Sequence, residues 1–224
     1  MSKPRPGSKL DQFMAYLTSH STLEILDLRS VLQQAKKVGG TYHMTDSHWN
    51  QYGAFIASNE VIQRLSKQML WLKPPSLKCF YREASEGPAG NLAWMLTGKY
   101  NLIERDCPTL RPRAPLPVLS VTREEGSWAT VRNPERKGKV IIFCDSFADG
   151  LLPFLAFHFN EVSLYRLYMG PHSIGLKQSS PAHPHIWKAA IIEQEKPDLV
   201  IDEILGSLLY IEDPASIKRE DALE

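Results

Sequence analysis

Apolar residues along this chain follow two spacings, and their alternation predicts helices separated by short strands. Between residues 49 and 69 they recur every three or four positions, as in an amphipathic helix, and Pro74-Pro75 ends that pattern. The same spacing predicts helices over 10–17, 29–37, 91–96, 147–157 and 185–195. Short apolar runs bounded by turn residues predict strands over 23–28, 77–81, 140–144, 162–165 and 199–204.

Apolar strands that alternate with helices are typical of an α/β fold. We therefore predict a mostly parallel sheet flanked by helices on both faces. Four prolines between residues 108 and 117 predict an irregular surface connection, and residues 117–122 and 128–131 predict a hairpin around Gly126. At 224 residues the chain is long enough for one large domain or two small ones. We predict a single domain over 1–224, with residues 1–9 flexible and 211–224 a polar tail.

Composition narrows the class of partner. The chain is 43% apolar and 23% charged with a formal net charge of +1, and no segment concentrates positive charge, which argues against a nucleic-acid partner. No apolar run is long enough to cross a bilayer. The first seven residues are polar and lack the apolar stretch of a signal peptide, so either the protein is cytoplasmic or an export segment is missing from this chain.

Cysteines and histidines give weak signals. Cys79, Cys107 and Cys144 form no CxxC pair, and the sequence does not decide whether Cys79 and Cys107 form a disulfide. His172, His183 and His185 share a segment rich in Gly, Ser and Pro, but their spacing matches no standard metal signature. We expect that segment to be a substrate-gripping loop, and we predict no metal and no cofactor.

Candidate chemistry comes from two distant motifs. Asp46 and His48 lie two residues apart where the long helix begins, and Ser146 follows the apolar strand 140–144 just before another helix. A serine hydroxyl needs a base, and the base needs an acid that orients it, so these three residues predict a serine acyl-transfer site. Backbone N–H groups of Ser146 or Phe147 at the helix start are candidate donors to an oxyanion.

Each motif also has a structural interpretation. Asp46 and Ser146 are common N-cap residue types and would serve helices equally well without any chemistry. Trp94, Trp128 and Trp187 are able to stack on sugar rings, although core packing is the default for any one of them. His43 is predicted to be structural.

Several stretches carry a family resemblance. Residues 46–54, read as D-S-H-W-N-Q-Y-G-A, resemble the D-T-H-W-N-x-x-G-A block of alginate O-acetyltransferase-like proteins, the DHHW group of SGNH-hydrolase-like enzymes. Residues 145–155 are similar to their D-S-F-x-x-x-L-x-P-F-L block, and 196–200 to K-P-D-x-V. Residues 90–93 are similar to G-D-L-A, with Asn91 in place of Asp. The resemblance covers about residues 23–209.

This resemblance implies an SGNH-hydrolase-like fold whose order is circularly permuted, because Asp-x-His precedes the serine. It implies Ser146 as nucleophile, His48 as base and Asp46 as orienting acid, with Phe147, Asn91 and Trp49 in oxyanion or substrate contacts. The implied reaction is O-acetylation of a bacterial polysaccharide such as alginate in the periplasm or cell envelope. The implied partners are that polysaccharide and a membrane-bound acyltransferase that supplies acetyl.

Two departures keep other functions open. Residues 203–207 lack the arginine that the family often carries after its last strand, and Asn91 replaces an acid. A carbohydrate or lipid esterase with the same triad, and an inactive polysaccharide-binding or scaffold protein, are therefore alternatives. The family also has an earlier strand before residue 10, so we expect either a truncated chain or a divergent member.

Overall fold

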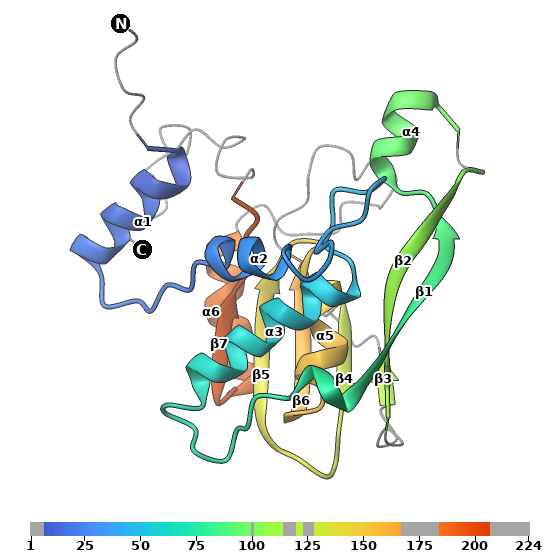
Figure 1. Cartoon of the computed structure of the whole chain (residues 1–224). Coiled ribbons are helices and arrows are strands. Elements are labelled where there is room, and N and C mark those ends of the chain that lie inside the picture. Colours follow the sequence, from blue (N-terminus) through green and yellow to red (C-terminus); the bar gives the residue numbers. More distant parts are fainter. Residues whose placement is uncertain (1–6, 100, 114–119, 123–127, 167–183, 207–224) are drawn as a thin grey trace, which may run out of the picture.

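The computed structural model describes residues 7–99, 101–113, 120–122, 128–166 and 184–206 (Figure 1). Their strands form a five-stranded sheet in the order β3-β4-β6-β5-β7 and a separate two-stranded sheet, β1-β2. The strands are β1 Phe80–Pro88, β2 Ile103–Pro112, β3 Ser120–Thr122, β4 Ala129–Arg132, β5 Lys137–Cys144, β6 Phe159–Arg166 and β7 Leu199–Asp202. The helices are α1 Lys9–His20, α2 Arg29–Ala35, α3 Gln51–Leu65, α4 Asn91–Thr97, α5 Ala148–Leu155 and α6 Pro184–Glu195, with a 3-10 turn at Leu77–Cys79.

The central sheet is mixed rather than mostly parallel. Strand β5 pairs in parallel with β6 and β7, whereas β4 pairs antiparallel with both β6 and β3. The predicted hairpin supplies the antiparallel half, because β3 and β4 are its two arms. The α/β class is confirmed, and the parallel half carries the βαβ connection through α5.

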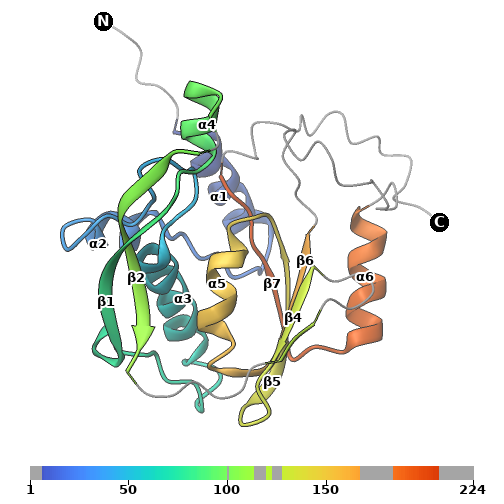
Figure 2. The same ribbon diagram turned by 90° about the vertical axis from the view of Figure 1, so that its right-hand side faces the viewer.

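Helices cover both faces of this sheet. Figure 2 shows α3 and α5 on one face and α6 on the other. Strand β5 explains this arrangement, since Val140, Ile142 and Cys144 point into the core beneath α3 and α5, while Ile141 and Phe143 pack with Ile191 of α6. Successive strand residues face opposite sides, so the part of β5 that is covered on both faces, residues 140–144, is apolar throughout.

The β1–β2 ribbon corrects two predictions. The proline-rich stretch is not an irregular connection up to Pro112, because β2 runs through Pro108 and pairs along its length with β1. Proline is tolerated there since only alternate N–H groups of a two-stranded ribbon face the partner strand. The strand predicted over 77–81 begins with the 3-10 turn and becomes β1 only at Phe80.

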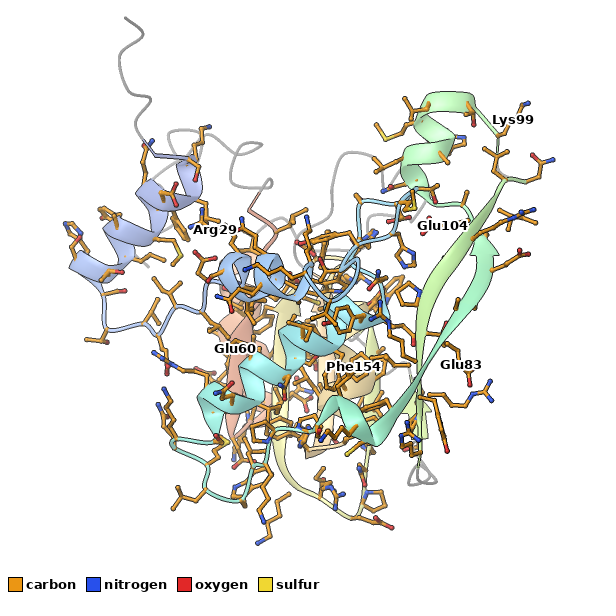
Figure 3. All side chains as sticks on the ribbon, in the orientation of Figure 1. Arg29, Glu60, Glu83, Lys99, Glu104 and Phe154 are labelled. Carbon is orange, nitrogen blue, oxygen red and sulfur yellow. The ribbon has the colours of Figure 1, made fainter. Side chains whose placement is uncertain are left out.

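Aromatic packing fixes this ribbon to the domain. The rings of Phe80 and Phe154 lie 6.0 Å apart and both meet Phe55 of α3 edge to face, at 5.3 and 5.6 Å. Figure 3 labels Phe154 between the helices and the ribbon. The ribbon is therefore held at this end, and its other end reaches the loop that precedes α3.

The strand predicted over 23–28 is wrong, because this segment joins α1 to α2 without pairing. Leu23 is 68% exposed, while Leu28 packs against the core at the start of α2. The apolar side chains of this segment therefore differ in their burial one by one, and no partner strand pairs with the segment. The other predicted helices and strands are present with shifted ends.

Some predictions fall outside the described residues. These are residues 1–6 of the flexible start, the tail 211–224, His172 and His183, and the side chains of His185 and Trp187. The three cysteines are free thiols, with Cys79 exposed and Cys107 and Cys144 buried. Among the described residues, no helix combines the length and apolar character that crossing a membrane requires.

Candidate active site

The Asp46–His48 pair lies on a short loop that the start of α3 shapes. Tyr42 and Trp49 form a single antiparallel bridge across the base of this loop. Asn50 caps α3 by accepting the N–H of Gly53 at 3.0 Å, and its amide donates to the carbonyls of Gly40 and Tyr42. Both ends of the loop are thus tied to the helix, which limits the directions that the two side chains can take.

Ser146 lies beyond the carboxyl end of β5, two residues before α5 begins. Its side chain is exposed, although both neighbours in sequence are buried. A strand that ends at the edge of a parallel sheet and is followed by a helix commonly presents functional side chains at the surface. The turn therefore brings a hydroxyl out of a buried strand.

The three predicted residues meet in one hydrogen-bonded chain. Nδ1 of His48 lies 2.5 Å from Oδ1 of Asp46, and Nε2 lies 2.6 Å from Oγ of Ser146, which is 98 residues away in sequence. The carboxylate partner favours the tautomer with the proton on Nδ1, which leaves Nε2 to accept the serine proton. The distances fit a nucleophile, a base and an orienting acid.

Asp46 is held as a carboxylate by its surroundings. Partial burial raises its pKa, but this is outweighed by hydrogen bonds from the backbone and ring of His48 and from the backbone of Asn91, so the pKa lies below its ordinary value. Oδ1 accepts the N–H of His48 at 2.8 Å, and Oδ2 accepts the N–H of Asn91 at 3.0 Å. Asp46 is therefore ionised at neutral pH and able to stabilise an imidazolium.

Asp145 fixes the turn that carries Ser146, a role the sequence did not reveal. Its side chain accepts the N–H of Phe147 at 2.8 Å and of Leu205 at 2.7 Å, and its own N–H donates to Glu203 at 3.2 Å. Burial and the nearby charge of Asp145 raise the pKa of Glu203 well above its ordinary value. The signal available in sequence was the acid immediately before the serine.

Phe147, Asn91 and Trp49, which were predicted to contact an oxyanion or substrate, each have other contacts. The N–H of Phe147 is already donated to Asp145, whereas that of Ser146 makes no hydrogen bond within the described part of the chain. The amide of Asn91 bonds Ser47, and only its backbone reaches Asp46. Trp49 is 8% exposed and packs edge to face on Phe147, so it belongs to the core beneath the site.

A shallow hollow of about 200 Å³ adjoins the relay, lined by His43, Asp46, His48, Pro88, Gly90 and Glu104. His43, predicted to be structural, lies in its wall with Nδ1 3.2 Å from Glu104.

Of the tryptophans considered for sugar stacking, Trp94 is 41% exposed on α4. Trp128 packs against the core with the guanidinium of Arg166 over its ring at 4.7 Å.

Fold and site together define an SGNH-hydrolase-like α/β protein. Residues 1–113 match the family described as the SGNH hydrolase-like domain of acetyltransferase AlgX, and the chain belongs to this family. The matched segment contains Asp46 and His48, and Ser146 lies beyond it. The circularly permuted order stays a prediction.

Solved structures show the same fold at low sequence identity. PatB1 of Bacillus cereus, also solved with a sulfonyl adduct, superimposes with a TM-score of 0.61 at 14% identity over 89% of this chain and 75% of that one. A DHHW family protein from Eubacterium siraeum gives 0.59 at 14% identity over 94% and 73%. The O-acetyltransferase domain of Pseudomonas putida AlgJ gives 0.52 at 18% over 98% and 74%. No curated protein matches the chain.

Proposed function

We infer that this protein transfers acetyl groups to polysaccharide hydroxyls through an acyl-serine intermediate on Ser146. The observation that carries this function is the continuous relay from Asp46 through His48 to the exposed hydroxyl of Ser146. Membership of an acetyltransferase family supports acetyl as the group transferred. The AlgJ domain, which has a similar fold, is described as an O-acetyltransferase domain; that activity belongs to AlgJ, and it agrees with this assignment.

Two balanced half-reactions follow from the relay. Oγ of Ser146 attacks the acetyl carbonyl of a donor, Nε2 of His48 takes the hydroxyl proton, and that proton passes to the leaving group. A sugar hydroxyl then attacks the acyl-serine and gives its proton to Nε2, and Oγ regains it as the acetyl ester of the sugar departs. Asp46 stabilises the imidazolium in both halves.

The backbone N–H of Ser146 is the proposed donor to the oxyanion. It has no partner within the described residues and lies at the positive end of α5, where negative charge is stabilised. The N–H of Phe147 is excluded from this role while it bonds Asp145. Removing one such donor costs about a hundredfold or more in rate, so the turn matters as much as the nucleophile.

The shape of the site supports a polymeric acceptor. The hollow beside the relay measures about 200 Å³ and the serine is exposed, whereas sites that enclose small molecules usually span roughly 300 Å³ or more. A hydroxyl on a chain that lies across the surface reaches such a serine without being enclosed. We place this reaction in the periplasm or cell envelope, with a membrane-bound acyltransferase as acetyl source and no nucleic-acid partner.

An esterase is the second candidate, and the same exposure favours it. Water reaches an exposed acyl-serine as easily as a sugar hydroxyl does, and the relay activates either one. The two functions therefore differ only in which acceptor captures the acyl group.

Turnover of p-nitrophenyl acetate with and without oligosaccharides separates these candidates. Ser146→Ala is compared with Ser19→Ala, which removes an exposed hydroxyl from α1. Acetyl on the sugar that depends on Ser146, together with an acetyl mass increase on that residue, supports transfer. Acetate release unaffected by acceptor supports the esterase. Equal behaviour of wild type and Ser146→Ala would leave the inactive polysaccharide-binding protein as the surviving alternative.

A further inference from the structure

Glu104, at the start of β2, is a buried carboxylate that the relay does not use. Its side chain is only 6% exposed, and Figure 3 shows it beside the base of α4. Burial raises its pKa, but hydrogen bonds led by that from Thr45 outweigh this effect and lower the pKa to about 2. Burying a charge costs free energy unless several hydrogen-bond donors surround it. The residues that donate to Glu104 therefore indicate what this carboxylate holds in place.

These partners come from the loop immediately before Asp46. Oε1 accepts the N–H of Met44 at 3.0 Å and Oε2 accepts the N–H of Thr45 at 2.9 Å. The hydroxyl of Thr45 also donates to Oε2. The donors lie 59 and 60 residues away in sequence, so Glu104 joins the ribbon to the loop that carries Asp46 and His48.

Thr45 extends this connection to α4. Its hydroxyl oxygen accepts the N–H of Gly90 at 3.0 Å, and its carbonyl accepts the N–H groups of Leu92 and Ala93 at 3.0 and 3.1 Å. Asn91, which lies between Gly90 and Leu92, donates its N–H to Asp46. Glu104 thus supports both the loop that carries Asp46 and the helix terminus that holds the Asp46 carboxylate.

A metal ion is the competing explanation for this cluster. A ring nitrogen of His43, a carboxylate oxygen of Glu104 and Sγ of Cys107 lie within 4.8 Å of one another. However, each oxygen of Glu104 already accepts a backbone N–H, and the sulfur and imidazole also approach Oε1, at 3.4 and 3.2 Å. These contacts satisfy the carboxylate without an ion.

We propose that Glu104 is a positioning residue, which fixes Thr45 and through it sets the direction of Asp46 and His48 towards Ser146. This inference rests on the proposed acyl transfer and deepens it. A carboxylate that is 6% exposed and holds two successive N–H groups defines the path of the backbone there more strictly than the loop would by itself.

The test compares Glu104→Gln with Glu86→Gln, an exposed glutamate on the same ribbon. Glu104→Gln keeps the shape but places an amide N–H against donors. We expect kcat for p-nitrophenyl acetate to fall by about 10- to 100-fold with KM little changed, because a misdirected base slows the chemical step. Thr45→Val, which removes only the hydroxyl, gives a smaller loss in the same direction.

A second readout does not require turnover. A hydrogen-bonded proton between Asp46 and His48 gives a far-downfield proton NMR signal, which we expect in wild type, Ser146→Ala and Glu86→Gln but not in folded Glu104→Gln. If wild type shows the signal and folded Glu104→Gln lacks it, but turnover does not depend on Ser146, the proposed function fails while the positioning role of Glu104 stands. Normal kcat or a retained signal in folded Glu104→Gln overturns the positioning role, as does loss of wild-type activity on metal chelation.

Discussion

Gly90 lies so close to the carboxyl group of Asp46 that a Cβ atom there would overlap the side chain. The hydrogen bond from Asn91 to Asp46 explains this approach, since it draws the start of α4 onto the carboxylate. The glycine is therefore required by space and not by its backbone angles, because its φ of −88° suits any residue.

Gly90→Ala should consequently displace Asp46 and leave His48 without its orienting acid. We expect kcat/KM for p-nitrophenyl acetate to fall by about a hundredfold, the size of loss that a displacement of about 1 Å produces. Gly87→Ala is the matched control, because an added Cβ there meets no atom within 4 Å. Similar activities for the two variants would contradict the close approach.

Asp46→Asn tests the charge of the same group while keeping its size. An amide cannot stabilise an imidazolium, and its N–H favours the wrong tautomer of His48, so we expect kcat to fall by about 10³- to 10⁴-fold. Asp27→Asn, which removes an ion-paired carboxylate from the surface before α2, should leave kcat unchanged. Circular dichroism checks that both variants are folded; a loss below tenfold in Asp46→Asn would argue against the relay.

The approach of Asp46, His48 and Ser146 to one another was predictable because both motifs adjoin strongly periodic helices and resemble blocks of one family. The residues that hold these three side chains in place were not predictable. Nothing local to Glu104 marks it as a partner of Thr45, since the contact depends on a ribbon whose prolines suggested a loop. The mixed sheet was missed for a related reason: apolar strands look alike in sequence whether their neighbours run parallel or antiparallel.

Sequence spacing does not tell what a group has already bonded or buried, as Trp49 and Phe147 illustrate. The N–H of Phe147 lies at a helix start, as expected, but Asp145 reaches it first. Trp49 neighbours His48 along the chain, yet on a tight loop the next residue points into the core. Such assignments depend on tertiary contacts that no single motif encodes.

Glu104 should make stability depend on acid. Its pKa of about 2 in the folded protein lies below its ordinary value of 4.5, so its contribution is present above pH 4.5 and is lost as the pH falls towards 2. Glu104→Gln should lose free energy of unfolding at pH 7 and show a shallower decline between pH 4.5 and 2. Urea unfolding at several pH values measures both, with Glu86→Gln as control. Parallel pH curves for wild type and Glu104→Gln would contradict this link.

Glu203 should give the opposite dependence. Burial and the charge of Asp145 raise its pKa, so the folded protein binds more protons than the unfolded chain above pH 4.5. The free energy of unfolding should therefore decline as the pH rises from about 4.5 to about 8, and level off once the folded carboxyl has lost its proton. Glu203→Gln mimics the protonated form and still accepts the N–H of Asp145, so its advantage over wild type should grow with pH.

Thermal melts at successive pH values measure this advantage, and Glu86→Gln again serves as the exposed control. A melting-temperature difference between Glu203→Gln and wild type that stays constant from pH 5 upward would show that Glu203 is charged in the folded protein. Asp145 accepts the N–H groups of both Phe147 and Leu205. A neutral glutamine at position 203 avoids a second negative charge beside Asp145, in the turn that carries Ser146. We therefore expect Glu203→Gln to retain turnover at high pH at least as well as wild type does.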